Sequence, residues 1–212
     1  PSTSSVSSLY FYAEASGGCS PVTSSISGLI SVVKPNPVIT AMPAVSKVFG
    51  APAFTLTDPA STSTGAFMYT SSNTAVATIT GNEVTIVGAG TAVISANQTA
   101  TAAYSSGSVT FNLTVTKASR TLTGFSASID KVYGSSAFVL PTVTRSAGTG
   151  SITYSSSNTS VATVNGATVT INGVGTATLN ANIAADANYG SATTSTLLTV
   201  SKASRTISGL AT

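Results

Sequence analysis

Apolar and polar side chains alternate in short runs along much of the chain. Between residues 177 and 183 every second residue is apolar, and residues 92–96 and 111–115 show the same period. A period of two places successive side chains on opposite faces of a strand, so each run is predicted to be a strand with one buried face. Glycines between the runs, such as Gly81 and Gly166, permit the positive φ of a tight hairpin turn. About six or seven short strands per unit, without any helical period, predict an all-β fold.

The pattern of strands and turns occurs in two successive copies. Lys47-Val-Phe-Gly50 recurs as Lys131-Val-Tyr-Gly134, and Tyr69-Thr-Ser-Ser-Asn73 recurs as Tyr154-Ser-Ser-Ser-Asn158. The offset is 84 residues at the first motif and 85 at the second, so one residue is inserted between Leu140 and Tyr154. A fixed long period indicates tandem structural units.

This period predicts four segments. Residues 37–120 and 121–205 form two complete repeats, residues 1–36 supply the closing strands of a preceding incomplete repeat, and residues 206–212 form the first strand of a following one. The chain is therefore expected to be a segment of a longer array. The alternative is a short protein whose end strands pair with neighbouring subunits.

A repeat of about 85 residues can close a modest core between two sheets. Together with the short strands and frequent turns, this length predicts immunoglobulin-like β-sandwiches in a linear array. The expected core of the first repeat comprises Tyr69, Val76, Ile79, Val84, Ile86, Ile94, Leu113 and Val115. The matching core of the second comprises Tyr154, Val161, Val164, Val169, Ile171, Leu179, Leu198 and Val200.

Several motifs carry a family resemblance. The run from Tyr154 to Gly166, followed by Val169-Thr-Ile and Gly173-Val-Gly-Thr, resembles the bacterial immunoglobulin-like tandem repeats of invasin- and intimin-type surface adhesins. Similar repeats occur in phage and virus structural proteins. The resemblance covers residues 38–205 and implies the sandwich fold. It does not select a function, because such repeats serve as stalk, spacer, adhesin and virion decoration.

The composition is apolar and nearly free of charge. Hydrophobic residues make up 42% of the chain, charged residues 6%, and the net charge is +3. Because the basic residues are scattered singly, a phosphate-binding stripe for nucleic acid is not expected. No apolar run reaches the ~18 residues of a membrane-spanning helix, so membrane insertion by this segment is not expected.

The chemistry of the chain argues against catalysis. It contains no histidine, so an imidazole base, a Ser-His-Asp triad or a histidine metal ligand cannot form. The five acids, Glu14, Asp58, Glu83, Asp130 and Asp186, are scattered, and the repeat places Thr168 where Glu83 stands. No enzyme activity, cofactor or metal is therefore predicted. Asp130 and Asp186 lie near predicted junctions or loops, where calcium can bind between domains, but a single carboxylate makes a poor calcium site.

Four residues are candidates for covalent modification. Cys19, the single cysteine, lies in Gly17-Gly-Cys-Ser-Pro21, which is predicted to be a loop. It is either an inert thiol or the site of an inter-chain disulfide. Asn97, Asn112 and Asn158 stand in N-glycosylation triplets, which also arise by chance in such a Ser- and Thr-rich chain. Alternation predicts that Asn112 points outward between Phe111 and Leu113.

Basic residues recur at the predicted domain junctions. Lys117 and Arg120 end the first repeat, and Lys202 and Arg205 end the second. They either set the angle between domains through hydrogen bonds to neighbouring loops or are solvated charges that protect an edge strand.

Two tyrosines in predicted loops, Tyr104 and Tyr189, occupy matching positions in the repeats. Each could stack on a ligand, or it could cap the end of its sandwich and leave its hydroxyl at the surface.

These observations predict a structural role. The leading hypothesis is a rod or spacer within an extracellular fibre, surface filament or virion appendage, which self-associates or packs against neighbouring repeats through polar surfaces. A first alternative is an adhesin stalk or binding module that engages a host receptor or glycan. A second is an accessory domain of a secreted carbohydrate-active enzyme. The expected location is extracellular, on a cell or virion surface.

Overall fold

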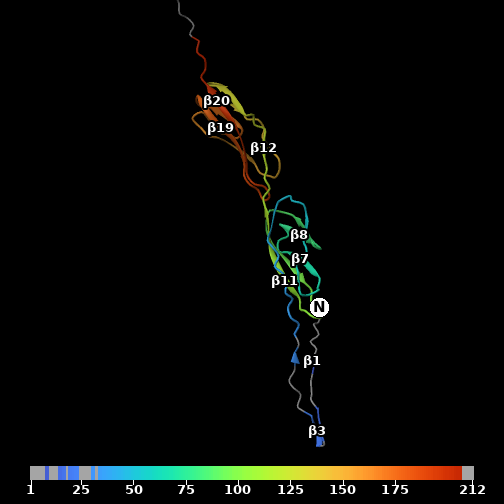
Figure 1. Cartoon of the computed structure of the whole chain (residues 1–212). Helices are drawn as coiled ribbons and strands as arrows, with labels where there is room; N and C mark the ends of the chain where they lie inside the picture. Colours follow the sequence, from blue (N-terminus) through green and yellow to red (C-terminus); the bar gives the residue numbers. More distant parts are fainter. Residues whose placement is uncertain (1–7, 10–13, 18, 24–29, 32, 207–212) are drawn as a thin grey trace, which may run out of the picture.

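The computed structural model describes residues 8–9, 14–17, 19–23, 30–31 and 33–206, with side-chain burial described from residue 33 onward. Within these residues every regular element is a β-strand. The strands build two sandwiches that follow one another along the chain (Figure 1). The predicted all-β fold of tandem immunoglobulin-like sandwiches is confirmed.

The first sandwich has a four-stranded sheet in the order β5-β11-β10-β7 and a three-stranded sheet in the order β6-β9-β8. Strand β5 runs parallel to β11, and the other pairs are antiparallel. The strands are β5 (Val45–Val48), β6 (Phe54–Thr55), β7 (Phe67–Ser71), β8 (Ala77–Thr80), β9 (Glu83–Ile86), β10 (Gly90–Gln98) and β11 (Gly107–Thr116).

The second sandwich repeats this topology. Its sheets have the orders β13-β20-β19-β16 and β14-β18-β17, and β12 pairs with β15 beside them. Strand β13 again runs parallel to β20. The strands are β12 (Leu122–Thr123), β13 (Ser128–Val132), β14 (Phe138–Val139), β15 (Thr144–Arg145), β16 (Ile152–Ser156), β17 (Ala162–Asn165), β18 (Thr168–Ile171), β19 (Gly175–Ile183) and β20 (Ala192–Ser201).

A separate set of short strands precedes the first sandwich: β1 (Ser8–Leu9) pairs with β4 (Ile30–Ser31), and β2 (Glu14–Gly17) pairs with β3 (Cys19–Thr23). The pairing of Ser8 with Ser31 has the same register as that of Thr91 with Thr114 in strands β10 and β11. Cys19 begins strand β3 and pairs with Gly17, so the predicted loop there is wrong, because the hairpin turns more tightly than expected. The side chain of Cys19, on which the choice between an inert thiol and an inter-chain disulfide depends, lies outside the described residues.

A hydrophobic core lies between the two sheets of each sandwich. It is formed by the apolar side chains that occupy every second position of the strands. Ile94 and Leu113 are fully buried in the first core, and their counterparts Leu179 and Leu198 are fully buried in the second. The other predicted core positions are buried or pack against the core from partly buried positions. Two small residues that the predicted core does not include, Ala77 and Ala162, are fully buried as well.

The predicted turn glycines have the expected backbone. Gly81 has a φ of 62° and Gly166 a φ of 58°, each at the first position of a two-residue hairpin loop. This is the left-handed region that a side chain disfavours. These turns set the register of β8 with β9 and of β17 with β18.

One buried position of the second core is polar where the first core has an aromatic residue. Thr196 lies in β20 where the first repeat has Phe111, and its hydroxyl has no hydrogen-bond partner among the described residues. We expect Thr196→Val to raise the unfolding free energy of the second sandwich by about 1 kcal/mol, because it removes a buried, unpaired hydroxyl at nearly constant shape. Urea unfolding of both proteins measures this change, and Thr194→Val, at a partly exposed position of the same strand, is the control. A destabilised Thr196→Val protein would contradict the expectation.

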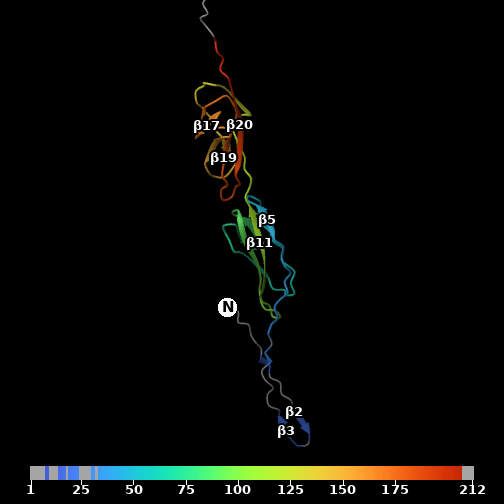
Figure 2. The ribbon, with the colours of Figure 1, turned by 90° about the vertical axis from the view of Figure 1, so that its left-hand side faces the viewer.

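The sandwiches lie end to end along one long axis, as two views at right angles show (Figures 1 and 2). Strand β11 ends at Thr116 and β12 begins at Leu122, so residues 117–121 connect the sandwiches. The linker contacts the loop that joins β19 to β20. Several hydrogen bonds connect the two segments at this junction.

Candidate functional site

The linker between the sandwiches pairs with the loop of residues 184–191, between β19 and β20. The Ala118 amide donates to the Asn188 carbonyl at 2.9 Å, and the Gly190 amide donates to the Ala118 carbonyl at 2.9 Å. Ala118 and Tyr189 thereby form a parallel bridge. The linker is thus held as a short added strand rather than as a free tether.

Arg120 is the buried centre of this junction, and its side chain is fully buried. Its Nε donates to the Gly190 carbonyl at 2.8 Å, its Nη1 to the Thr149 carbonyl at 2.9 Å and to Asp186 Oδ2 at 3.0 Å, and its Nη2 to the Ala184 carbonyl. A buried guanidinium is tolerated only when its charge and donors are matched in this way. Arg120 therefore fixes the linker to two separate loops of the second sandwich.

Asp186 completes the site. Its Oδ2 accepts from the Thr149 amide at 2.9 Å as well as from Arg120, and its Oδ1 accepts from the amides of Asn188 and Tyr189 at 2.9 and 2.7 Å. The Thr149 hydrogen bond, then those of Tyr189 and Asn188 and the charge of Arg120, lower the pKa of the Asp186 carboxyl to about 2, although desolvation opposes them. Both oxygens of this carboxylate accept hydrogen bonds from protein donors, and the guanidinium of Arg120 stands beside it.

The junction should weaken in acid because of this shift. The pKa of Asp186 in the folded protein, about 2, lies below its ordinary value of 3.8. The ionised form therefore stabilises the fold fully above that ordinary value, and this stabilisation is lost as the pH falls through about 2. We expect the thermal midpoint of the wild type to exceed that of Asp186→Asn at pH 6 and to converge with it near pH 2. An equal gap at both pH values would contradict the assignment.

The first sandwich contributes a second set of contacts. Phe49, just after β5, meets the ring of Tyr189 edge to face, with centroids 5.5 Å apart at 82°. The Ala89 amide, in the turn before β10, donates to Asn188 Oδ1 at 2.9 Å, and Lys117 Nζ donates to the Asp186 carbonyl at 2.5 Å. The ring of Tyr189, which was predicted to stack on a ligand or to cap its own sandwich, packs against Phe49 of the neighbouring sandwich.

The inserted residue of the second repeat lies in the loop that Arg120 holds. The bridge between Ile39 and Ser61 in the first repeat is equivalent to the pairing of Leu122 with Arg145 in the second. The pairing of Phe67 with Gln98 is likewise equivalent to that of Ile152 with Ile183. The extra residue therefore lies between Arg145 and Ile152. In the first sandwich this shorter loop is held from inside by Gln98, whose amide nitrogen donates to the Ser63 and Gly65 carbonyls at 2.9 Å each. In the second, Ile183 replaces Gln98, and Arg120 holds the loop from outside.

Gly148, in this loop, is required by the packing around Arg120. Its φ is 79°, and a Cβ there would stand 2.5 Å from Asp186 Oδ2 and 2.8 Å from Arg120 Nη1. We expect Gly148→Ala to lower the unfolding free energy of the second sandwich by about 2–3 kcal/mol. Gly134→Ala is the control, because its φ is 91° but its Cβ would meet nothing within 4 Å. That variant should lose only about 1 kcal/mol, and equal losses in urea unfolding would contradict the steric argument.

The preceding junction shares the backbone pattern but lacks the ion pair. Lys34 Nζ donates to the Thr101 carbonyl at 2.8 Å, and the Ser105 amide donates to the Pro35 carbonyl at 3.0 Å. Pro37 stands where the later junction has Arg120, and Thr101 stands where it has Asp186. Arginine, aspartate and the longer loop thus occur together in one junction and are absent together from the other. Tyr104, in the loop of the preceding junction, is partly exposed.

The remaining candidates lie away from this junction or at the far end of the second sandwich. Lys202 and Arg205 are exposed, and so is Asn112, between buried Phe111 and Leu113 as alternation predicted. Asn97 is partly buried in β10. Asn158 Oδ1 accepts a hydrogen bond from the Ser160 amide at 3.1 Å. Asn73 forms the same turn in the first repeat, although it does not stand in a glycosylation triplet. Asn158 therefore has a structural role in this turn.

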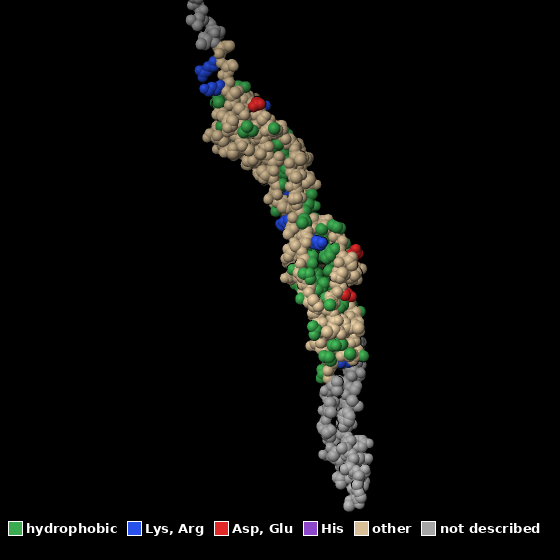
Figure 3. All heavy atoms as spheres, viewed as in Figure 1, with side chains coloured by type: hydrophobic (Ala, Val, Ile, Leu, Met, Phe, Trp, Pro, Cys, Tyr) green, Lys and Arg blue, Asp and Glu red, His purple; other side chains and the backbone are tan. Residues whose placement is uncertain are grey.

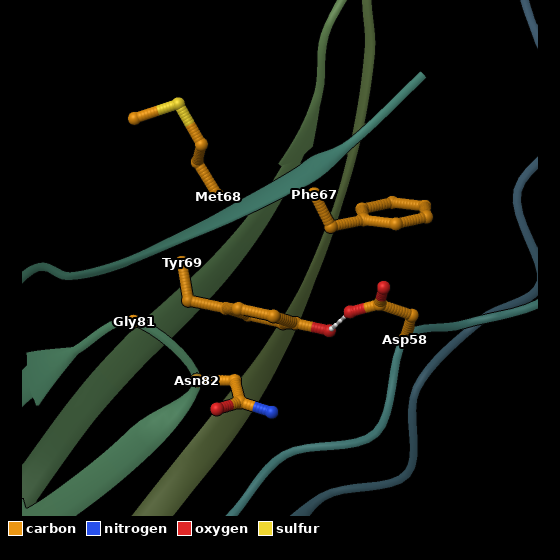
Figure 4. A pocket seen from close by; sticks show the side chains of 6 residues that line it. All are labelled: Asp58, Phe67, Met68, Tyr69, Gly81 and Asn82. Carbon is orange, nitrogen blue, oxygen red and sulfur yellow. Dashed lines mark hydrogen bonds between the residues drawn. The ribbon is translucent and has the colours of Figure 1, made fainter. Parts of the chain in front are cut away.

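An open hollow of about 390 Å³ lies on the first sandwich (Figure 4). The Tyr69 hydroxyl donates to Asp58 Oδ1 at 2.8 Å, and burial followed by this hydrogen bond raises the pKa of the hydroxyl. Asn82 Nδ2 donates to the Leu56 carbonyl at 3.1 Å, whereas Met68 is 63% exposed and points away from Asp58. The second repeat has Thr153 and Ala167 in place of Met68 and Asn82, so the hollow is specific to the first.

The surface offers little other chemistry. Figure 3 shows only a few charged side chains on the face drawn, among hydrophobic side chains and uncharged polar or backbone atoms. In the part of the chain that the structure describes, no three acidic, cysteine or histidine side chains gather as a metal site would require. None of the described elements is a helix long and apolar enough to cross a membrane.

Comparisons with known proteins find similarity to solved structures alone. No protein-family model and no curated protein matches the chain. Among solved structures, Drosophila N-cadherin EC1-4 is 13% identical with a TM-score of 0.34, over 92% of this chain and 58% of that one. The titin domains z1z2 in complex with telethonin are 15% identical with a TM-score of 0.35, over 82% of this chain and 100% of that one. Domains 4-9 of the surface layer protein SbsC are 14% identical with a TM-score of 0.32, over 74% of this chain and 25% of that one. The resemblance to invasin- and intimin-type repeats stays a prediction.

Proposed function

We propose that the chain is a non-enzymatic structural segment, a rod or spacer of serial sandwiches in an extracellular fibre, cell-surface filament or virion appendage. The observation that carries this proposal is the buried Arg120, which joins the linker to two loops of the second sandwich. A flexible linker needs no buried residue that fixes it to its neighbour. A spacer that keeps its length and direction needs such a fixed connection between successive sandwiches.

The contacts at the junction come from both sandwiches. Asn188 accepts from Ala89 of the first sandwich through its side chain and from Ala118 of the linker through its carbonyl. Phe49 and Tyr189 pack across the same boundary. Rotation of one sandwich against the other would break all of these contacts, so the junction supports one orientation rather than the range available to a Gly/Ser linker.

The outer faces of the long strands suit lateral packing. Hydroxyl and amide side chains pair across β10 and β11, as in Thr91 with Thr114, and across β19 and β20, as in Thr176 with Thr199 and Asn180 with Ser195. Such faces offer many weak polar contacts with little charge repulsion. Self-association with neighbouring rods through these faces is part of the proposal.

A distance measurement tests the rigid spacer. Spin labels at Thr85 and Thr170, exposed and equivalent positions in β9 and β18, report the arrangement of the sandwiches in a Cys19→Ser background. We expect electron–electron double resonance to give one narrow distance distribution. A broad distribution would contradict a rigid spacer.

The hollow on the first sandwich favours a second candidate, binding of a host glycan. Its exposed Met68, aromatic Tyr69 and carboxylate of Asp58 combine an apolar face with hydrogen-bonding groups. The combined variant Met68→Thr and Asn82→Ala gives the hollow the residues of the second repeat. If a glycan array shows binding to the wild type that this variant loses, the second candidate holds; no binding by either protein counts against it.

A further inference from the structure

The second sandwich carries, at its far end, identical or related residues at the positions that the first sandwich and the linker use at the junction. Tyr133 corresponds to Phe49, Val174 to Ala89, Lys202 to Lys117 and Arg205 to Arg120. We call the set Tyr133, Val174, Lys202 and Arg205 the distal surface. Its topological setting is the same, because Tyr133 follows β13 and Lys202 follows β20 as Phe49 follows β5 and Lys117 follows β11.

The two surfaces differ in what covers them. Arg120 is 6% exposed, whereas Arg205 is exposed. Phe49 is partly buried under Tyr189, whereas Tyr133 is 49% exposed. Val174 is 46% exposed, whereas Ala89 is partly buried against Asn188. The distal surface therefore has the residues of an interface without the loop that covers the first one.

We propose that the distal surface binds an immunoglobulin-like sandwich whose loop has the form Asp-x-Asn-Tyr-Gly, placed head to tail as residues 186–190 are placed on the first sandwich. The inference rests on the proposed serial array and adds to it the identity of the contact. Arg205 pairs with the aspartate, Tyr133 packs on the tyrosine, and the Val174 amide donates to the asparagine side chain.

Arg205 also selects among sandwiches. A loop of the first repeat's type carries Thr101 at the position of Asp186, and it offers no carboxylate to a guanidinium. Covering Arg205 with that loop would bury its charge without the partner that Arg120 has in Asp186. The structure thus assigns to the distal surface, as its binding partner, a sandwich whose loop carries the aspartate. Such a sandwich also has the longer loop that contains the counterpart of Gly148.

Two extended chains test the proposal. In one, residues 121–205 are repeated directly after Arg205; in the other, residues 38–120 follow Arg205, so that the added loop carries the counterpart of Thr101. The Nε–H signal of Arg205, assigned in NMR spectra with Arg205→Lys, reports burial through its exchange with water. Arg120 in the unextended chain gives the reference for a covered guanidinium.

We expect exchange of the Arg205 signal to slow by about tenfold or more in the first extended chain and to change little in the second. Replacing the added copy of Asp186 by asparagine should remove most of the slowing, and dispersed methyl signals of the added sandwich show that it is folded. Fast exchange in the first chain despite a folded addition would overturn the proposal, and equal slowing in both would overturn selection by the aspartate. Fast exchange of Arg120 itself in the unextended chain would instead contradict the rigid spacer.

Discussion

Replacing Arg120 with alanine is expected to lower the unfolding free energy of the second sandwich by about 3 kcal/mol, the largest effect of any single change at the junction. The variant leaves the carbonyls of Thr149, Ala184 and Gly190 without their shared donor. Asp186 keeps its three backbone donors, so its own turn should persist. Urea unfolding measures the loss of free energy, and the spin-label distances should broaden in the same variant.

Two variants separate the roles of charge and geometry. Arg120→Lys keeps the positive charge but cannot reach acceptors on two loops at once, so it should recover only a small part of the loss. Lys117→Ala removes an exposed residue with a single hydrogen bond across the junction and should cost about 0.5 kcal/mol or less. If Arg120→Ala and Lys117→Ala cost the same, the buried guanidinium is not what holds the junction.

Truncation of one core leucine should unfold one sandwich early and leave the other in place. Leu113 and Leu198 are equivalent and fully buried, one in each core. Replacement of either by alanine leaves a cavity and should cost about 3 kcal/mol, which lowers the midpoint of that sandwich by roughly 15 °C. Scanning calorimetry should therefore show two transitions in Leu198→Ala, the lower one from the second sandwich.

The first sandwich should keep its midpoint in Leu198→Ala, because its core contacts lie within residues 42–115. In Leu113→Ala we expect the converse: the transition of the first sandwich shifts to lower temperature by a similar amount, and the second keeps its midpoint. If either variant melts in one transition with both sandwiches shifted equally, the junction couples the two folds and they do not unfold as separate units.

The fold was predictable because alternation and turn glycines are local signals. Ile94 and Leu113 recur two residues from other apolar positions, and Gly81 marks its turn without reference to anything distant. Buried alanines such as Ala77 were left out of the predicted core because a small side chain gives only a weak apolar signal. The hairpin at Cys19 was misjudged because two glycines in succession suggested a longer loop than the strands form.

The junction was predictable only in part. Its location followed from the recurrence of Lys117 and Arg120 at the end of a repeat, but the pairing of Arg120 with Asp186 joins residues 66 positions apart. One signal could have revealed it: the preceding junction has Pro37 and Thr101 at the matching positions, so arginine and aspartate change together between the two junctions. The role of Gly148 depends on a close approach in space that no single-sequence pattern records.

The parallel pairing of β5 with β11 and of β13 with β20 determines how each sandwich responds to tension. When the chain is pulled from both ends, parallel neighbours slide in opposite directions, so their hydrogen bonds are strained in shear and must break together. An antiparallel hairpin pulled at its open end would lose the same bonds one after another at lower force. Four paired positions in the first sandwich, Val45 to Val48, and five in the second, Ser128 to Val132, share the load. Each sandwich is therefore built to resist stretching along the axis on which the two are aligned.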